Sequence, residues 1–268
     1  MTVQAIAFDL DDTLLRDDRT ISPYTLSVLR RAAEKGICII PASGRTSRSM
    51  GQFVDQIGCA SCYVCCNGAE VRTPEHQLLM QELIPVALAK EVAAWAEAKG
   101  VYAQTYDDVR FYFNRHGKYA EDYKISSSLE GEYVGNLEAF MTQPTTKILL
   151  MDDPARIAEL LREAQSLWDG RVSLTCSKPF FLEVNPLRAT KGNALEWIAG
   201  HHGFSMEQLV AFGDSLNDMS MLDAAGTGIA MANAREDVKS RVAVICRSNE
   251  EDGVAHYIED YILKEERP

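Results

Sequence analysis

Two aspartates, Asp9 and Asp11, directly follow a short apolar run from Ile6 to Phe8. In an extended backbone, residues two apart point to the same side of the chain, so these two carboxylates are directed into one space. Buried carboxylates without a partner are costly, and they require a cation or a proton beside them. The start of the chain therefore predicts a buried strand that ends in a candidate site for chemistry.

The N-terminal part of the chain alternates strand and helix patterns. Expected strands lie at 3–10, 37–41 and 62–66, and expected helices at 22–35 and 46–57. Ser22-Pro23 supplies a cap residue followed by proline, and Gly36 ends the first helix. This alternation is typical of a parallel sheet with helices on both faces.

The pattern changes in the middle of the chain and then returns. The middle block predicts a hairpin at 70–79, helices at 86–99 and 154–168, and strands within 101–113 and at 147–151, 172–175 and 180–184. After Pro186 come helices at 189–201, 215–224, 235–240 and 251–263, with strands at 209–213, 228–231 and 243–246. We therefore predict an α/β core of residues 1–82 and 186–268, interrupted by an inserted α+β cap of residues 83–185.

The charge of the chain excludes some partners. It has 27 lysines and arginines against 39 aspartates and glutamates, a formal net charge of −12. Nucleic acid requires a basic face, so this balance argues against it as a partner. Neither a signal peptide nor an apolar run of membrane-spanning length is found, so we expect a cytoplasmic protein with no membrane contact. A phosphate site in so acidic a chain needs local positive charge, from a metal, a lysine and helix N-termini.

Seven cysteines, an odd number without secretory context, predict reduced thiols. Cys59, Cys62 and Cys65 have the C-x2-C-x2-C spacing that an iron–sulfur or zinc site would use. The fourth ligand with its following proline is absent, however, and 62–66 has the pattern of a buried strand. We therefore favour small buried side chains over metal ligands here.

Four segments lie where an open parallel sheet binds ligands, beyond the carboxyl ends of its strands. Asp9 and Asp11 follow the first strand, and Ser43-Gly44-Arg45 follows the second. The run 214–218 follows a late strand, and Lys191-Gly192 opens the helix after the middle block. Each segment alone is weak evidence, because such residues also occur as caps, loop residues and solvated helix positions. Together they place carboxylates, a hydroxyl, backbone donors, a lysine and an asparagine at one edge.

These residue types suit phosphoryl transfer. A carboxylate can attack phosphorus and form an acyl phosphate, and a divalent cation would neutralise the approaching anions. Mg²⁺ prefers oxygen ligands, and Asp9, the carbonyl of Asp11 and Asp214 would suit it. Asp11 could protonate the leaving oxygen and later deprotonate water. That role requires the pKa of Asp11 to lie above that of Asp9, which the metal would hold ionised.

The remaining polar residues suit the phosphate group and its surroundings. Ser43, the amide of Gly44, Lys191 and Asn217 would hold the non-bridging oxygens. Arg45 is expected to pair with a carboxylate, and Asp218 to orient Lys191 or a metal-bound water. Asp214 and Asp218 are like charges four residues apart near one helix start, which is unfavourable unless a cation or the helix dipole offsets it.

In their order along the chain, these segments resemble the four motifs of the haloacid dehalogenase superfamily, in its Cof-type sugar-phosphatase branch. The first motif, D-x-D-x-T, is matched by 9–13, the second by Ser43 and the third by Lys191. The fourth, G-D-x-x-N-D, is matched by 213–218. The Asn-Gly-Ala turn that precedes the cap in this branch is matched by 67–69, and the middle block takes the place of the cap.

The resemblance implies a Rossmann-like core and a Mg²⁺-dependent phosphatase that acts on small phosphorylated metabolites such as sugar phosphates. It implies Asp9 as nucleophile, Asp11 as acid and base, and Asp9, Asp11 and Asp214 as metal ligands. The implied phosphate contacts are Leu10, Ser43, Gly44, Lys191 and Asn217, supported by Thr13, Arg45, Asn67 and Asp218. Asp12 stands where this branch usually has glycine, and aspartate tolerates unusual backbone angles better than most residues.

Two other functions fit the same core. The acyl phosphate could pass to another hydroxyl instead of water, which would make the chain a phosphotransferase or phosphomutase. The chain could also be a regulatory protein that binds phosphate without turnover. The complete set of Asp9, Asp11, Lys191 and Asp214 favours an enzyme over that regulator.

Overall fold

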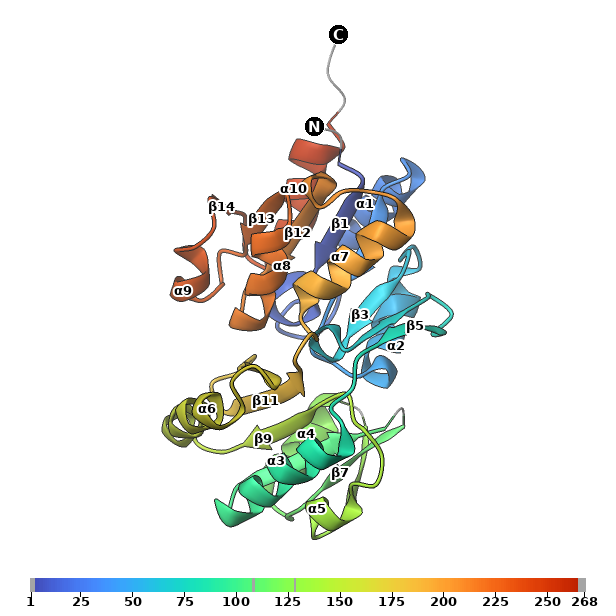
Figure 1. Cartoon of the computed structure of the whole chain (residues 1–268). Helices are drawn as coiled ribbons and strands as arrows, with labels where there is room; N and C mark the ends of the chain where they lie inside the picture. The colour runs from blue at the N-terminus through green and yellow to red at the C-terminus, as the bar shows by residue number, and fades with distance from the viewer. Residues whose placement is uncertain (1–2, 108, 128, 265–268) are drawn as a thin grey trace.

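The computed structural model describes residues 3–107, 109–127 and 129–264, which form two lobes, one above the other in Figure 1. The upper lobe holds the residues of the predicted core, and the lower lobe holds those of the predicted cap. We keep the names core (1–82 and 186–268) and cap (83–185) for these two sets. A loose tail is predicted at 264–268, and apart from Lys264 it lies outside the described residues.

The core contains a five-stranded sheet in which every pair of neighbours is parallel. Its strands, in spatial order, are β14 (Val244–Ile245), β13 (Thr227–Ala230), β12 (Leu209–Gly213), β1 (Ala5–Phe8) and β2 (Cys38–Pro41). In the register, Phe8 lies opposite both Phe212 and Pro41. The carboxyl ends of β12, β1 and β2 are therefore side by side, and the residues that follow them meet at one edge.

Helices cover both faces of this sheet. They are α1 (Pro23–Glu34), α2 (Ser47–Ile57), α7 (Lys191–His202), α8 (Met219–Ala224), α9 (Glu236–Lys239) and α10 (Gly253–Tyr257), with helical turns at Leu10–Leu14, Cys66–Gly68, Met206–Gln208, Leu216–Asp218 and Ile258–Ile262. Helix α7 packs with α8 on one face, and α1 packs with α10 on the other (Figure 1). The helix N-cap predicted at Ser22 is present, since the Ser22 side chain accepts a hydrogen bond from the Thr25 amide at the start of α1. The predicted α/β fold is confirmed.

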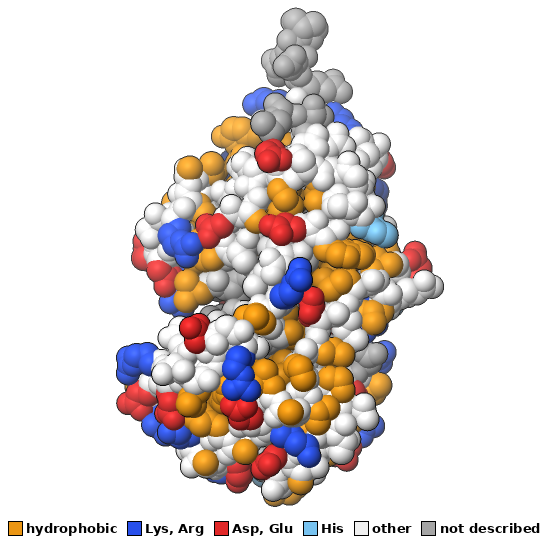
Figure 2. All heavy atoms as spheres, viewed as in Figure 1, with side chains coloured by type: hydrophobic (Ala, Val, Ile, Leu, Met, Phe, Trp, Pro, Cys, Tyr) orange, Lys and Arg blue, Asp and Glu red, His pale blue; other side chains and the backbone are white. Residues whose placement is uncertain are grey.

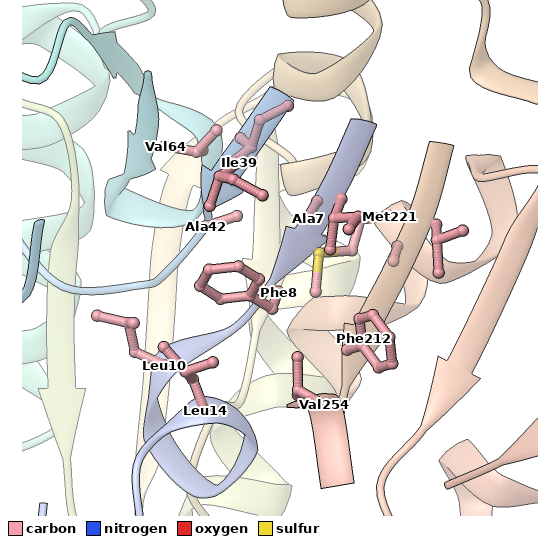
Figure 3. Packing of buried hydrophobic residues seen from close by; sticks show 14 of the residues in the cluster. Ala7, Phe8, Leu10, Leu14, Ile39, Ala42, Val64, Phe212, Met221 and Val254 are labelled. Atoms are coloured by element: carbon pink, nitrogen blue, oxygen red, sulfur yellow. The ribbon is translucent and has the colours of Figure 1, made fainter. Parts of the chain in front are cut away.

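Apolar side chains anchor the backbone that carries the two N-terminal aspartates. Phe8 and Leu10, which flank Asp9, are fully buried, and Leu14 is buried beside them (Figure 3). Phe212, on the neighbouring strand, belongs to the same cluster. Burying a side chain of this size stabilises the fold by about 1.5–3 kcal/mol. The turn after β1 is therefore held by the core on both sides of Asp9.

The third expected strand differs from the prediction. Strand β3 (Tyr63–Cys65) pairs antiparallel with β4 (Glu70–Arg72), which pairs with β5 (Leu78–Gln81) in a separate three-stranded sheet. It lies beside the parallel sheet, where Val64 forms an isolated parallel bridge with Ala42 and its carbonyl accepts a hydrogen bond from the Ser43 amide at 3.0 Å. Cys66 and Asn67 both have positive φ, 50° and 56°, so the chain turns back at once and pairs with itself. The hairpin predicted at 70–79 is confirmed.

The cap is built on a six-stranded mixed sheet. Its strands, in spatial order, are β10 (Val172–Thr175), β11 (Phe181–Pro186), β9 (Ile148–Met151), β6 (Tyr102–Tyr106), β7 (Arg110–Phe113) and β8 (Glu130–Tyr133). Its helices are α3 (Val86–Ala98), α4 (Lys118–Ser127), α5 (Leu137–Phe140) and α6 (Pro154–Trp168). The inserted α+β character is confirmed.

Three cap elements, α4, β8 and α5, were not predicted. Helix α4 buries only three residues, Ala120, Tyr123 and Ser127, so its apolar pattern is sparse. All four residues of β8 are exposed, and α5 is a single turn. Elements of this kind leave little hydrophobic periodicity in the sequence, which is the main signal for predicting them.

The aromatic residues of the cap serve mainly in packing. Tyr102, Tyr106, Phe111 and Phe113 are buried in one cluster with Tyr123 of α4. Sheet packing is what the strand spacing of this aromatic set favours, and the structure confirms it for these residues.

Both connections between the lobes lie close to the predicted boundaries. The chain enters the cap after β5 and leaves it through β11, which ends at Pro186, one residue beyond the predicted cap. The division into domains at 82/83 and 185/186 itself remains a prediction. Acidic and basic side chains are interspersed over both lobes on the face in Figure 2. Among the described helices, none has the length and apolar character needed to cross a bilayer.

Candidate active site

The expected convergence of distant segments is present. Asp9 follows β1, Asp214 follows β12, and Ser43 follows β2 after one residue. All three line a cavity of about 240 Å³ between the core and the cap. Carboxylate oxygens of Asp9, Asp214 and Asp218 lie within 4.8 Å of one another. The edge of the parallel sheet thus brings together carboxylates that are two hundred residues apart in the chain.

Lys191, the first residue of α7, lies fully buried behind this cluster. Its Nζ donates to Asp218 Oδ1 at 2.6 Å, and it lies 2.9 Å from Asp9 Oδ1, within ion-pair distance but without hydrogen-bond geometry. Burial works against the ammonium, but the charges of Asp218 and Asp9 outweigh it and raise the pKa of Lys191. The expected contact between Asp218 and Lys191 is therefore present.

Asp218 is fully occupied by the protein. Its Oδ2 accepts hydrogen bonds from the amides of Asp214 and Ser215, both at 2.9 Å, while Oδ1 holds Lys191. A Cβ on Gly213 would come within 2.5 Å of the Asp218 Cβ, so only glycine permits this close approach. Asp218 closes the turn after β12 and fixes the lysine.

Asp9 and Asp214 repel one another in a buried position. Burial raises the pKa of Asp9 well above its usual value; Lys191 lowers it, and the neighbouring carboxylates raise it further. Burial and the charge of Asp218 raise the pKa of Asp214 to about 7, although Ser215 and Thr13 donate hydrogen bonds to it at 2.8 Å each. The expected supporting residue Thr13 is thus bonded to Asp214. A cation at this cluster would relieve the repulsion.

Asp11 is held by Arg45, as expected for that arginine. The guanidinium donates from Nε to Asp11 Oδ2 at 2.7 Å and from Nη2 to Oδ1 at 2.6 Å. Burial would raise the pKa of Asp11, but these hydrogen bonds and the charge of Arg45 lower it. The pKa order of Asp9 and Asp11 among these side chains is therefore the reverse of the expected one. Asp12 adopts φ +57°, the left-handed conformation expected where the branch usually has glycine.

The loop after β2 offers donors to the cavity. Ser43 is buried, and its Oγ accepts a hydrogen bond from the Arg45 amide at 3.3 Å. The Gly44 amide has no hydrogen-bond partner among the described residues. A Cβ on Gly44 would lie 2.8 Å from Asn67 Oδ1, so a side chain would not fit there. Leu10 is fully buried, so any phosphate contact from it must come from its backbone.

Three asparagines connect the site to the cap. Asn217 Nδ2 donates to Asn67 Oδ1 at 3.1 Å, and Asn67 Nδ2 donates to Asn185 Oδ1 at 3.4 Å. Asn217 Oδ1 is buried without a hydrogen-bond partner. The phosphate contact expected of Asn217 needs a donor, whereas its free atom is an acceptor, which suits a cation better.

Sequence reasoning missed the cap residues that line this cavity. Tyr123, Lys147, Phe181 and Glu183 belong to them. Lys147 and Glu183 form an ion pair at 3.2 Å and are only 3% and 2% exposed. A signal was available, because Glu183 interrupts an apolar run that predicts a strand and Lys147 directly precedes another. Charged residues so close to buried strands are rarely fully buried unless paired.

The fold and the cluster define an α/β protein with a parallel-sheet core, an inserted cap and an acidic site at the edge of the core sheet. The family model for haloacid dehalogenase-like hydrolases matches residues 6–258. The chain belongs to this family, and its predicted place in the Cof-type branch is confirmed. Its family and its named relatives show that it is a phosphatase, a hydrolase of phosphoric monoesters that acts on phosphorylated metabolites.

Relatives of known name match over nearly their whole length. The chain is 31% identical over 266 residues to the 5-amino-6-(5-phospho-D-ribitylamino)uracil phosphatase YitU of Bacillus subtilis, with 96% of each chain covered. It is 28% identical over 286 residues to the pyridoxal phosphate phosphatase YbhA of Escherichia coli, covering 98% of this chain and 100% of the relative. The solved structure of TM0651 from Thermotoga maritima has a TM-score of 0.82 and 30% identity, with 97% of each chain covered.

Proposed function

We propose that the chain is a Mg²⁺-dependent phosphatase that works through an aspartyl-phosphate intermediate on Asp9. The observation that carries this proposal is the cluster of Asp9 and Asp214 beside the buried Lys191, in a cavity that also contains Ser43 and Gly44. The cluster supplies a nucleophile and negative charge for a cation, while the lysine and the loop supply positive charge and donors for a phosphate.

The donor set fits a hard divalent cation. Asp9 and Asp214 are neighbouring buried carboxylates with raised pKa values, and Asn217 Oδ1 is a buried acceptor without a partner. Oxygen donors of this kind are the ligands that Mg²⁺ prefers. Asp9, Asp214 and the Asp11 carbonyl would hold the ion, and Asp218 would not, because Lys191 and two amides occupy its oxygens. When bound, Mg²⁺ would neutralise the phosphate and keep Asp9 ionised.

The reaction would proceed in two displacements. In the first, an oxygen of Asp9 attacks phosphorus, the ester P–O bond breaks, and Asp11 gives a proton to the leaving oxygen. In the second, Asp11 takes a proton from water, the hydroxide attacks phosphorus, and the bond to Asp9 breaks, which releases inorganic phosphate. Lys191 and the Gly44 amide stay on the non-bridging oxygens throughout.

The acid role of Asp11 places a condition on Arg45. With two hydrogen bonds from the guanidinium, Asp11 stays ionised and has no proton to give. Substrate binding therefore has to shift Arg45 from Asp11, for example towards the anionic substrate, before the leaving oxygen can be protonated. Arg45 lines the same cavity that the substrate would enter.

The substrates are proposed to be small phosphorylated metabolites, such as sugar phosphates or phosphorylated cofactor-related compounds. A cavity of about 240 Å³ that cap residues help to line suits a small molecule. Tyr123 and Phe181 at its wall offer apolar surface to a ring. The named substrates of the relatives, pyridoxal phosphate and 5-amino-6-(5-phospho-D-ribitylamino)uracil, belong in the first panel.

Phosphate release from a metabolite panel, with Mg²⁺ and with chelator, tests the proposal. We expect release that needs Mg²⁺ and that Asp9→Asn lowers by at least about 10⁴-fold, as for other nucleophile removals. Continued turnover by this variant would contradict the assignment of the nucleophile. Isomerised or transferred phosphate with little free phosphate would instead make the chain a mutase or phosphotransferase.

A further inference from the structure

Lys147 is a buried lysine that the proposed reaction does not use. It lies directly before β9 in the cap, is 2% exposed and faces the cavity. Its Nζ donates to the carbonyl oxygen of Gly44 at 2.7 Å and to Glu183 Oε1 at 3.2 Å, and it lies 5.1 Å from the centre of the Tyr106 ring. A buried ammonium persists only where its partners compensate for lost water. Here one of those partners is the backbone of a core loop.

The carbonyls of this loop are held in two different ways. The amide of Asn67 donates to Ser43 O at 3.1 Å, and the amide of Cys66 donates to Arg45 O at 2.8 Å. Both donors belong to the core. Gly44 O, between them, accepts its hydrogen bond from the cap, through Lys147. The carbonyl of this middle peptide thus has its hydrogen bond only when the cap sits in this position.

The effect reaches the Ser43 hydroxyl through one peptide plane. Because a peptide unit is planar, the Gly44 carbonyl and the Arg45 N–H turn together. The Arg45 N–H donates to Ser43 Oγ at 3.3 Å, which leaves the hydroxyl hydrogen free to donate elsewhere. A donor on the Gly44 carbonyl also polarises the same peptide and strengthens the next bond. Lys147 therefore acts on a phosphate donor that it does not touch.

Glu183 ties this lysine to the exit from the cap. Strands β9 and β11 are neighbours (Figure 1) and run antiparallel, with Ile148 opposite Val184. The Lys147–Glu183 pair joins them at this end. Glu183 Oε2 also accepts from Thr175 on β10 at 3.2 Å. Beyond β11 the chain re-enters the core and soon reaches Lys191. The ion pair joins the ends of β9 and β11 that lie next to the phosphate loop.

We propose that Lys147 is a positioning residue. The ammonium of Lys147 fixes the Gly44 carbonyl and, through that peptide, the Ser43 hydroxyl that would donate a hydrogen bond to the phosphate group. Seating of the cap and affinity for the phosphate group are thereby coupled, whatever the leaving group is. This inference rests on the proposed function, since it assumes that the loop binds phosphate.

The test measures how tightly inorganic phosphate binds as an inhibitor. Inorganic phosphate has no leaving group, so the cap residues cannot contact one. Lys147→Met removes the donor, and Lys147→Met with Glu183→Met also removes the carboxylate that would otherwise stay buried and unpaired. We expect both to raise the inhibition constant of phosphate about tenfold and to lower kcat/KM about 10²-fold for every ester alike, as misplacement of a binding group does. Glu183→Gln, which keeps the bond to Gly44, should change the phosphate constant by less than about threefold.

Folding is followed in parallel, and Lys124→Met, in the exposed Lys124–Glu130 pair of the cap, is the matched control. An unchanged phosphate constant, with losses that depend on the leaving group, would mean that Lys147 reads substrate, and the inference would be wrong. It would also be wrong if the double variant melted like the wild type and bound phosphate equally well. If the wild type neither turned over esters nor bound phosphate by calorimetry, the proposed function would fail as well.

Discussion

The core and the cap each bury one lysine beside a carboxylate, and the two pairs differ in what surrounds them. Lys191 in the core lies within ion-pair distance of Asp9 and Asp218, and Asp214 belongs to the same carboxylate cluster. Lys147 in the cap faces a single carboxylate, Glu183, and a backbone carbonyl. An excess of buried negative charge calls for a further cation, whereas a matched pair is neutral by itself. We therefore propose a role in the reaction for Lys191 and a role in positioning for Lys147.

Removing the metal should have the largest effect on activity, because the core site needs a cation and the cap pair does not. Chelation is expected to lower phosphatase activity by at least about 10³-fold, because the reaction then lacks the charge that a metal supplies to the phosphate. Added Mg²⁺ should also raise the melting temperature of the wild type, since it relieves repulsion between Asp9 and Asp214, but not that of Asp214→Asn. Melting curves with and without Mg²⁺ check this. An equal shift in both proteins would place the ion elsewhere.

The two lysines should differ in their effect on catalysis. Lys191→Met is expected to lower kcat/KM by about 10³-fold, because it removes a charge from the reacting phosphate. That is a larger loss than the one expected for Lys147→Met, which acts through the loop. Steady-state kinetics of both variants on one substrate make the comparison. Equal losses would contradict the distinction between direct contact and positioning.

The buried Lys147–Glu183 pair of the cap should have a clear effect on the free energy of unfolding. Lys147→Met should lower the free energy of unfolding by about 3 kcal/mol, because it leaves the Glu183 charge buried and unpaired. The double variant with Glu183→Met should recover most of this loss, since two apolar side chains replace the pair. Denaturant unfolding measures both. No recovery in the double variant would show that the loss comes from the bond to Gly44 instead.

The stability effect of Lys147 should not depend on pH near neutrality. Burial lowers its pKa, but Glu183 and neighbouring groups outweigh burial, so the folded pKa lies above the usual value. A raised lysine pKa contributes stability that is complete below the unfolded pKa of about 10.4 and is lost as the pH rises through the folded value. The loss in the double variant with Glu183→Met, which leaves no carboxylate unpaired, should therefore be equal at about pH 6 and pH 9. A smaller loss at the higher pH would contradict the assigned charge.

The exposed cap pair should have the smallest effect. Lys124 and Glu130 lie 2.7 Å apart on the surface, with side chains 48% and 75% exposed. Water screens such pairs, so Lys124→Met should change neither the unfolding transition nor the phosphate constant measurably. A clear change in either would weaken the argument that burial separates the important lysines from the others.

The sequence by itself determined the core and the residues at its site. Alternating apolar runs and helix caps predicted the parallel sheet, and strand ends predicted where Asp9, Ser43 and Asp214 lie. This works because the ends of parallel strands share one edge, so position in sequence implies position in space. The Arg45 pairing and the left-handed Asp12 also followed from local chemistry.

Only the tertiary structure decided the rest. The antiparallel pairing of β3, the lowered pKa of Asp11 and the meeting of Lys147 with Gly44 all depend on contacts between distant segments. Local periodicity does not report such contacts. A charged residue in an apolar strand has the same sequence neighbours whichever distant residue it contacts after folding. The physical reason is that burial and pairing of charges are set by packing between segments that are far apart in the sequence.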